Sequence, residues 1–152
     1  MKPKDLHLIS CLRQNGRETI TNLSKETHIP ISTIFDKLKT YQDSLIQKVT
    51  CLIDTKKLGY DLKVQLFFKV RPDEKDKFKS FLKGNPHTNT LYSINNNYDF
   101  FVEAIFRNTS DLNEFYKETE KFAIEQRQEH FVLEEVTKER FLSIKECLPT
   151  TS

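Results

Sequence analysis

The sequence is poor in the features on which several enzyme and membrane classes depend. It has only three glycines, too few for a glycine-rich phosphate-binding loop, and neither an HExxH nor a GxSxG pattern occurs. Its longest apolar run, residues 100–106, contains Glu103 and is far too short to span a bilayer. The histidines are scattered and form no catalytic constellation. We therefore expect no enzyme, no catalytic residues, no cofactor and no membrane segment. The four histidines are His7, His28, His87 and His130.

Cysteine is also scarce, and its three copies are spread through the chain. No CxxC pair occurs, and no cysteine stands at metal-ligand spacing from a histidine. An odd number of distant cysteines does not suggest a disulfide framework. We expect reduced, mostly buried thiols, no metal site and a cytoplasmic protein, since the N-terminus also lacks the shape of a signal peptide. The three positions are Cys11, Cys51 and Cys147.

No large charge of one sign is present, because 24 Lys and Arg residues face 22 Asp and Glu residues. The resulting net charge of +2 does not by itself indicate a polyanionic partner. The distribution is uneven, however. Residues 1–60 hold ten basic and six acidic residues, a net charge of +4, whereas residues 61–152 hold fourteen and sixteen, a net charge of −2. This asymmetry favours nucleic-acid binding by the first part.

Residues 20–41 show the pattern of two short helices joined by a tight turn. Thr19 or Thr21 can cap the first helix. Pro30 has no backbone N–H and disfavours α conformation in the residue before it, so the chain turns there, yet proline suits a helix start. In the second helix, apolar residues repeat at helical spacing and are expected to face inward. These residues are Ile31, Ile34, Leu38 and Tyr41.

The other side chains of this second helix form a short, polar and basic face. A helix-turn-helix presents such a face to a DNA groove. Ser32 and Thr33 at the helix start can bond phosphates or base edges, and Lys37 lies one turn further on. Asp36 fits less well because phosphates repel a carboxylate, so it either accepts from a cytosine amino group or pairs within its own helix. The alternative is an ordinary pair of helices with a solvated outer face.

The segments on either side of this motif extend it into a domain. Residues 5–14 predict a first helix, which the turn at Asn15-Gly16 ends. Residues 45–53 are rich in β-type residues and predict a strand that leaves the head. The inward positions of the first helix are expected to be Leu6, Ile9, Leu12 and Cys11. The expected organisation is a helix-turn-helix domain at 1–45, a linking strand and hinge at 46–60, and a second domain at 61–152.

From residue 62 onward the pattern is strand, helix, strand, strand, helix, strand. Residues 62–70 alternate in the way a strand does, and the asparagine-rich segment 95–98 predicts a hairpin turn because asparagine tolerates positive φ. This order is the ferredoxin-like βαββαβ arrangement, so the fold class is α+β. We expect strands at 62–70, 88–94, 99–106 and 131–137, helices at 72–82 and 111–123, a charged link at 124–130 and a short final helix at 140–148.

Residues 100–106 of the expected third strand indicate how the sheet is covered. They are apolar on both sides apart from Glu103, which implies that both faces of the sheet are buried. The two helices of a βαββαβ domain cover only one face. In a module this small the simplest cover for the other face is a second copy, so we expect a homodimer.

The ordered set of elements resembles the Lrp/AsnC family of transcription regulators, the leucine-responsive or feast/famine regulators. The head carries the resemblance over residues 5–17 and 20–41, and the linker carries it over Leu45-Ile46 and residues 53–60. The second half carries it in its element order and in Tyr98-Asp99. The resemblance implies a winged helix-turn-helix head followed by a ferredoxin-like effector and dimerisation domain. It also implies binding to promoter DNA as a dimer that assembles into tetramers or octamers, modulated by an amino acid or another small effector.

Carried over by position, the resemblance assigns the exposed polar side chains of the head to DNA. Base contacts are implied for Ser32, Thr33, Asp36 and Lys37. Charge and exposure favour phosphate contacts from Lys39, Thr40, Arg17 and Lys25. A rival interpretation keeps the fold but makes the chain a ligand-sensing or protein-interaction module without DNA-binding activity.

The resemblance is weaker in the effector region. In the family, amino acids bind near the loop before the third strand of the second domain, which commonly contains a glycine just ahead of the aspartate. Here that loop has no glycine, so the pocket is either altered or absent. The positions implied for effector binding are Asn97, Tyr98 and Asp99. Asp99 can hold a ligand's ammonium group, or it can merely begin the strand and cap the turn.

Overall fold

The chain divides into two compact units in the computed structural model, which describes residues 1–143. One unit comprises Met1–Leu52 together with the described chain from Val136, and the other is Ile53–Glu135. Within the described residues, no helix is long and apolar enough to cross a membrane. Most of the final helix expected at 140–148, and Cys147, lie outside the described residues.

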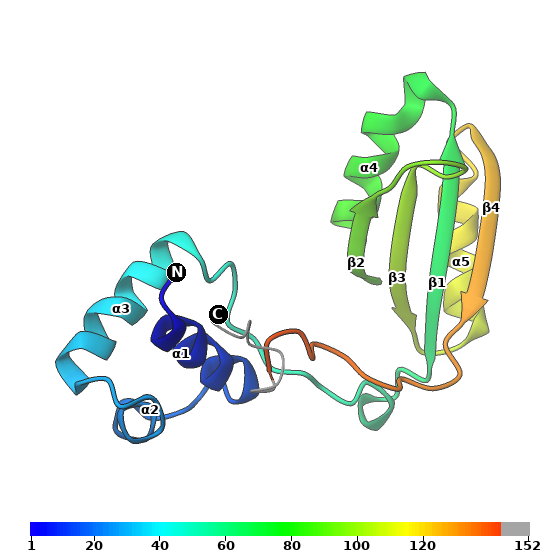
Figure 1. Ribbon diagram of the computed structural model, residues 1–152. Helices are drawn as coiled ribbons and strands as arrows, with labels where there is room; N and C mark the ends of the chain where they lie inside the picture. Colours follow the sequence, from blue (N-terminus) through cyan, green and yellow to red (C-terminus); the bar gives the residue numbers. More distant parts are fainter. Residues whose placement is uncertain (144–152) are drawn as a thin grey trace. The chain divides into compact units, whose positions relative to one another are not determined.

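The first unit contains three helices: α1 (Pro3–Gln14), α2 (Ile20–Thr27) and α3 (Ile31–Ser44) (Figure 1). The Thr19 hydroxyl caps α2 by accepting from the backbone N–H of Asn22 at 3.2 Å. His28 then adopts a left-handed conformation with φ of 52°, and Pro30 precedes the first residue of α3. The predicted helix pair and its tight turn are therefore confirmed.

The core of this helical unit is small. Its buried apolar side chains are Leu8, Leu23, Ile29 and Ile34. The first helix thus buries Leu8 most deeply, while Leu6 and Ile9, predicted to face inward, are half-buried. The prediction for Ile31 is wrong, because 53% of this residue is exposed. Ile29, in the turn ahead of the proline, fills the core in its place, so α3 buries only Ile34 fully.

The linker differs from its prediction. No strand forms at 45–53, and residues 46–60 contain only one short 3-10 helix, η1 (Lys56–Leu58). The described head therefore consists of helices, without the wing strand that the resemblance implied. The β-type residues Val49, Leu52 and Ile53 are each about two-thirds exposed. A strand requires a neighbouring strand for its backbone hydrogen bonds, and no described segment pairs with this one. The expectation of mostly buried thiols is also wrong for Cys51, which is exposed.

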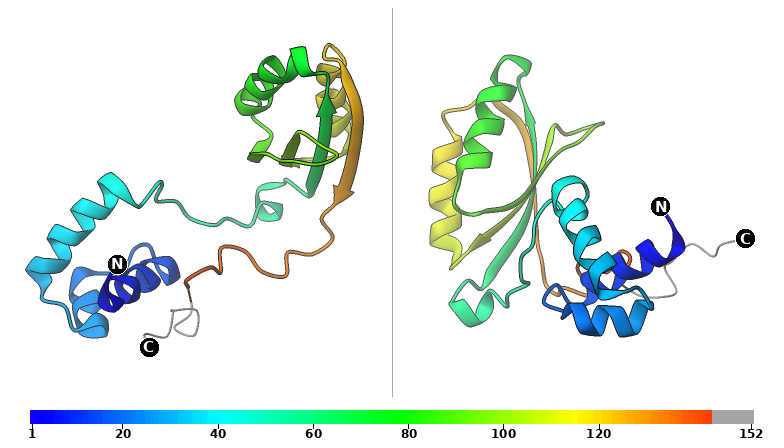
Figure 2. Two further views of the ribbon diagram at one scale, coloured as in Figure 1. Left: turned by 45° about the horizontal axis from the view of Figure 1, so that its top comes forward. Right: turned by 90° about the vertical axis from the view of Figure 1, so that its left-hand side faces the viewer.

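The second unit is a four-stranded antiparallel sheet with helices on one face (Figure 2). The strand order β2-β3-β1-β4 is that of the predicted ferredoxin-like fold, which is confirmed. The left-handed Asn96, with φ of 69°, confirms the hairpin turn between the second and third strands. Its elements are β1 (Leu62–Val70), η2 (Pro72–Glu74), α4 (Lys75–Gly84), β2 (Thr88–Ser93), β3 (Phe100–Phe106), α5 (Thr109–Thr119) and β4 (Ile124–Phe131).

The prediction for the last strand is wrong in position. The strand is β4, which occupies the segment predicted to be a charged link, while residues 132–137 form no strand. The polar sequence of β4 does not indicate a strand, because glutamate and glutamine are uncommon in strands. As an edge strand paired only with β1, it can carry polar side chains on most positions, and seven of its eight residues are exposed.

The core of the sheet unit is larger and rich in phenylalanine. The inward side chains of β1 alternate as predicted and pack against α4 and α5. Phe78 of α4 lies at the centre, and its ring centroid is 5.0 Å from the ring centroids of both Phe68 and Phe122. The buried residues are Val64, Leu66, Phe68, Val70, Phe78, Leu82, Phe100, Val102, Ala104, Phe106, Leu112 and Phe115.

The described chain after Val136 packs on the helical unit rather than on the sheet. Arg13, in the last turn of α1, donates to the backbone carbonyls of Glu139 at 2.9 Å and Phe141 at 3.0 Å. The Gln14 side chain donates to the carbonyl of Ser143 at 2.6 Å. The predicted second domain, 61–152, therefore differs from the structural unit, which ends at Glu135.

Candidate nucleic-acid interface

The outward side of α3 gathers most of the side chains predicted to bind DNA. A helix turns by about 100° per residue, so positions 32, 36, 39 and 40 fall within an arc of about 100°. Thr33 lies beside them, and all five residues are exposed. The Thr40 hydroxyl also donates to the backbone carbonyl of Asp36 at 3.0 Å. The five residues are Ser32, Thr33, Asp36, Lys39 and Thr40.

Lys37 belongs to a different part of the helix. Its ammonium Nζ lies 2.7 Å from Oδ1 of Asp5 in α1, and only 30% of its side chain is exposed. The hydrogen bond from Lys37 holds the pKa of the Asp5 carboxyl below its usual value, and the same bond raises the pKa of Lys37. Burial raises the pKa of the neighbouring Tyr41. The ion pair joins α1 to α3, which does not favour the predicted base contact by Lys37.

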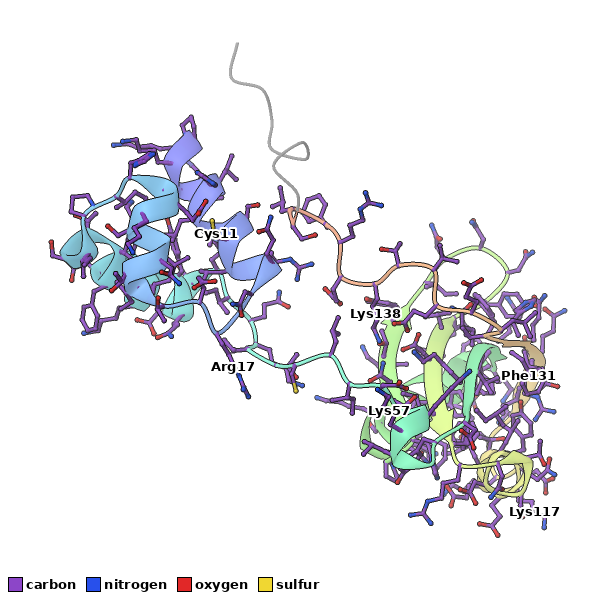
Figure 3. The ribbon with its side chains drawn as sticks, turned by 90° about the horizontal axis from the view of Figure 1, so that it is seen from below. Cys11, Arg17, Lys57, Lys117, Phe131 and Lys138 are labelled. Carbon is purple, nitrogen blue, oxygen red and sulfur yellow. The ribbon has the colours of Figure 1, made fainter. Side chains whose placement is uncertain are left out.

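The two remaining predicted cations lie on other elements of the helical unit. Arg17 lies exposed in the turn between α1 and α2, where its backbone N–H donates to the side-chain oxygen of Asn15 at 3.1 Å (Figure 3). Lys25 is exposed in the last turn of α2. Both side chains are accessible to a phosphate backbone, as the predicted role requires.

In the hairpin predicted to bind an effector, the Asp99 carboxylate is already engaged by bonds within the protein. Asp99 accepts from the backbone N–H of Val70 at 2.9 Å and pairs with Lys75, whose Nζ is 2.5 Å from Oδ1. Burial raises the pKa of Asp99, but these two bonds outweigh it, so the pKa lies below its usual value. The carboxylate already has a cation and a backbone donor. This geometry favours the interpretation that Asp99 caps the turn over the one in which it holds a ligand's ammonium group. Asn97 is exposed.

The face of the sheet away from α4 and α5 carries an aromatic patch. The Phe67 ring lies 5.1 Å from Phe101, 5.6 Å from Tyr98 and 5.9 Å from His130. Tyr92 stacks on Phe101 with 6.0 Å between ring centroids. Sequence reasoning had named Tyr98 only as an effector residue and had missed Phe67, Tyr92 and His130. Phe67 could have been found from its position in β1. It lies between two core residues, and because side chains alternate along a strand, it points to the opposite face of the sheet.

Two hollows lie elsewhere on the units. One, of about 510 Å³, is lined from α1 and α2 by polar side chains that include His7, Ser10 and Glu18. The other, of about 430 Å³, lies beside α5 and β4, where Tyr116 donates to Glu129 and the Arg127 guanidinium stands 3.7 Å from the centre of the Tyr116 ring. Among residues 1–143, no cluster of His, Cys, Asp and Glu side chains could hold a metal ion.

Comparisons with curated proteins find relatives that match most of the sequence. An uncharacterised HTH-type transcriptional regulator of Pyrococcus horikoshii is 27% identical over 139 residues, which cover 90% of this chain and 93% of that protein. The HTH-type transcriptional regulator FL11 of the same organism is 29% identical over 112 residues, which cover 73% of this chain and 74% of that protein.

Solved structures share the fold over nearly the whole chain. A transcriptional regulator of Neisseria meningitidis, in complex with L-Met, superimposes with a TM-score of 0.83 at 20% identity and covers 91% of this chain and 93% of its own. AsnC of E. coli does so with a TM-score of 0.79 at 18% identity, covering 91% and 95%. The family model for the Lrp/AsnC ligand-binding domain matches residues 64–142. The chain therefore belongs to the Lrp/AsnC family.

Proposed function

We propose that the chain is a sequence-specific transcription regulator that binds promoter DNA in the cytoplasm through the outward side of α3. The observation that carries the proposal is the accessible polar face of this helix, which follows directly on a tight turn from α2. Hydroxyls, a carboxylate and a cation on such a face match the donor and acceptor edges of bases in the major groove. The relatives named as HTH-type transcriptional regulators support the same function.

The residue roles follow from the geometry. Ser32, Thr33, Asp36 and Thr40 approach base edges, and Lys39 reaches a base or a phosphate from the same face. Arg17 and Lys25 contact phosphates on either side. Lys37 is assigned a positioning role, because its bond to Asp5 fixes the angle of α3 against α1.

We further propose a homodimer formed through the aromatic patch of the sheet unit, which assembles into tetramers or octamers. The patch consists of Phe67, Tyr92, Tyr98, Phe101 and His130, and none of the helices of its own unit covers it. Aromatic residues are enriched at protein interfaces. A two-fold axis would place the same patch on both sides of the contact.

An amino acid or another small effector is proposed to modulate DNA binding. The matching family model describes a ligand-binding domain, and one structural relative was solved with L-Met. The hairpin residues Asn97, Tyr98 and Asp99 remain the proposed contacts, with Asp99 acting mainly through the turn. Thermal melting and DNA-binding titrations with each of the common amino acids test this point, and no change in either with any of them would contradict it.

The experiment for the central proposal is a titration of the purified full chain onto a fluorescent duplex from its own upstream region, with a scrambled duplex as control. We expect tighter binding to the native duplex, and binding to both that weakens as salt rises, because bound cations displace counterions from DNA. No binding to either duplex would overturn the proposal. That result would instead support a ligand-sensing or protein-interaction module without DNA-binding activity.

A further inference from the structure

Two large apolar side chains stand exposed on the helix proposed to enter DNA. Ile31 is 53% exposed and Phe35 is 60% exposed. They are four residues apart, so they lie one turn apart on the same side of α3. The core of the helical unit includes neither of them.

Their neighbours set the chemistry of the surface that surrounds them. Lys39 lies one further turn along, so the row 31, 35, 39 runs apolar, apolar, cationic on one side of the helix. Ser32 and Asp36 follow Ile31 and Phe35 in sequence and are also exposed. The apolar pair therefore borders the polar face assigned to DNA, between that face and the side of the helix that packs on the core.

The small size of the pair argues against a protein partner as its occupant. A stable protein interface buries about 800 Å² on each side, whereas one aromatic side chain buries about 150 to 250 Å². Two apolar side chains, bordered on one side by hydroxyls and charges, fall short of that area. The major groove of DNA offers a better match, because each thymine presents there one apolar group, its C5-methyl, beside polar base edges.

We infer that Ile31 and Phe35 read thymine C5-methyl groups in the major groove, with Lys39 bonding a base or phosphate at the next turn. The inference rests on the proposed function and adds to it a preference for thymine at particular positions of the DNA site. The recognised DNA site must contain thymines at the positions that these two side chains meet. Their exposure in the free protein is then explained by the methyl groups that cover them in the complex.

The test compares thymine with uracil, which lacks only the methyl group. Duplexes that bind the full chain are first selected from a randomised pool. The tightest one is then synthesised with uracil in place of each thymine in turn, which leaves all base-pair hydrogen bonds intact. Binding is measured for the unaltered chain and for Ile31→Ala, Phe35→Ala and Leu45→Ala. Leu45 is the matched control, since it is 46% exposed and directly follows the last residue of the same helix, at the end away from Ile31.

We expect one or more uracil substitutions to weaken binding of the unaltered chain about fourfold each, the factor that corresponds to about 0.8 kcal/mol for one buried methyl group. Phe35→Ala or Ile31→Ala should bind the thymine and uracil forms of that position equally, while Leu45→Ala keeps the fourfold difference. Equal binding of thymine and uracil duplexes by the unaltered chain would overturn the inference while leaving the proposed function intact. So would a methyl preference that survives both substitutions. Failure to select any duplex would overturn the proposed function and the inference together.

Discussion

The two units differ in what they bury and in what they leave exposed. The helical unit encloses a core of four buried apolar residues and exposes a mainly polar helix face bordered by Ile31 and Phe35, whereas the sheet unit encloses twelve buried apolar residues and exposes an aromatic patch. A polar, partly cationic surface suits a polyanionic partner. An aromatic surface suits a protein interface, such as one with a second copy of the same chain. The difference between the two exposed surfaces supports the proposal that one unit contacts DNA and the other mediates self-association.

The largest expected effects come from replacing one large buried side chain in each core by alanine. Phe78→Ala should destabilise the sheet unit by about 3 to 5 kcal/mol, because it removes a fully buried aromatic ring. Leu23→Ala should destabilise the helical unit by about 2 to 5 kcal/mol. Hydrogen exchange measured peptide by peptide should show each loss confined to its own unit. Equal loss of protection in both units for either variant would contradict their independence.

The next largest effect is expected at the aromatic patch. Phe101→Glu should raise the dimer dissociation constant at least 30-fold, an effect of about 2 kcal/mol, because a buried charge without a partner is costly. Sedimentation analysis measures it. Lys117→Glu is the matched control, since Lys117 lies exposed on α5 at the helix-covered side of the sheet (Figure 3). A stable dimer from Phe101→Glu would place the contact elsewhere.

Two lysines of α3 are expected to have different roles, one in DNA contact and one in packing within the helical unit. Lys39→Ala should weaken DNA binding by about 1 to 3 kcal/mol, and should lower the salt slope by about one if Lys39 meets a phosphate. Lys37→Ala should leave the salt slope unchanged, because its ammonium is engaged with Asp5. Titrations of both variants over a range of salt separate the two roles. The reverse order, with the slope lowered only by Lys37→Ala, would restore Lys37 as a DNA contact.

The smallest effect concerns the ion pair between α1 and α3. Asp5→Asn should cost about 1 kcal/mol of helical-unit stability at pH 7, since the pair is only partly buried. The pKa of Asp5 is lowered in the folded state, so its stabilising contribution is present above its unfolded value of about 3.9 and is lost as pH falls through the lower folded value. The pKa of Lys37 is raised in the folded state, so at the alkaline end the contribution is fully present below its unfolded value of about 10.4 and is lost as pH rises through the higher folded value. Thermal melting at pH 3, 7 and 11 checks this, and an Asp5→Asn penalty that grows toward pH 3 would contradict it.

Much of the fold could be predicted because strong periodicity and clear stop signals occur together. Alternation over β1, a threonine cap at the start of α2 and the proline at the start of α3 each act locally, so the sequence alone indicates them, although it left the cap open between Thr19 and Thr21. The strand β4 could not be found this way. It is polar, and its strand conformation depends on the ladder with β1, which brings Phe68 opposite Arg127.

The candidate site was predicted in outline but not in its details. Helical spacing separated inward from outward residues of α3, yet it could not show that Asp5, 32 residues away, would engage Lys37. It also placed Ile31 inside, because periodicity cannot tell which of two neighbouring apolar residues, Ile29 or Ile31, fills a small core. Contacts between distant segments decide both points, and a pattern within one helix does not contain them.

Lysine footprinting tests the central claim most directly. The full chain is acylated with a lysine reagent in the presence and absence of a selected duplex, and the modification of each lysine is measured by mass spectrometry. We predict that Lys39 and Lys25 of the helical unit lose reactivity when DNA binds, whereas Lys79 and Lys117 on the helices of the sheet unit keep theirs. Protection of Lys79 and Lys117 with unchanged reactivity at Lys39 would show that DNA binds the other unit, and would contradict the account.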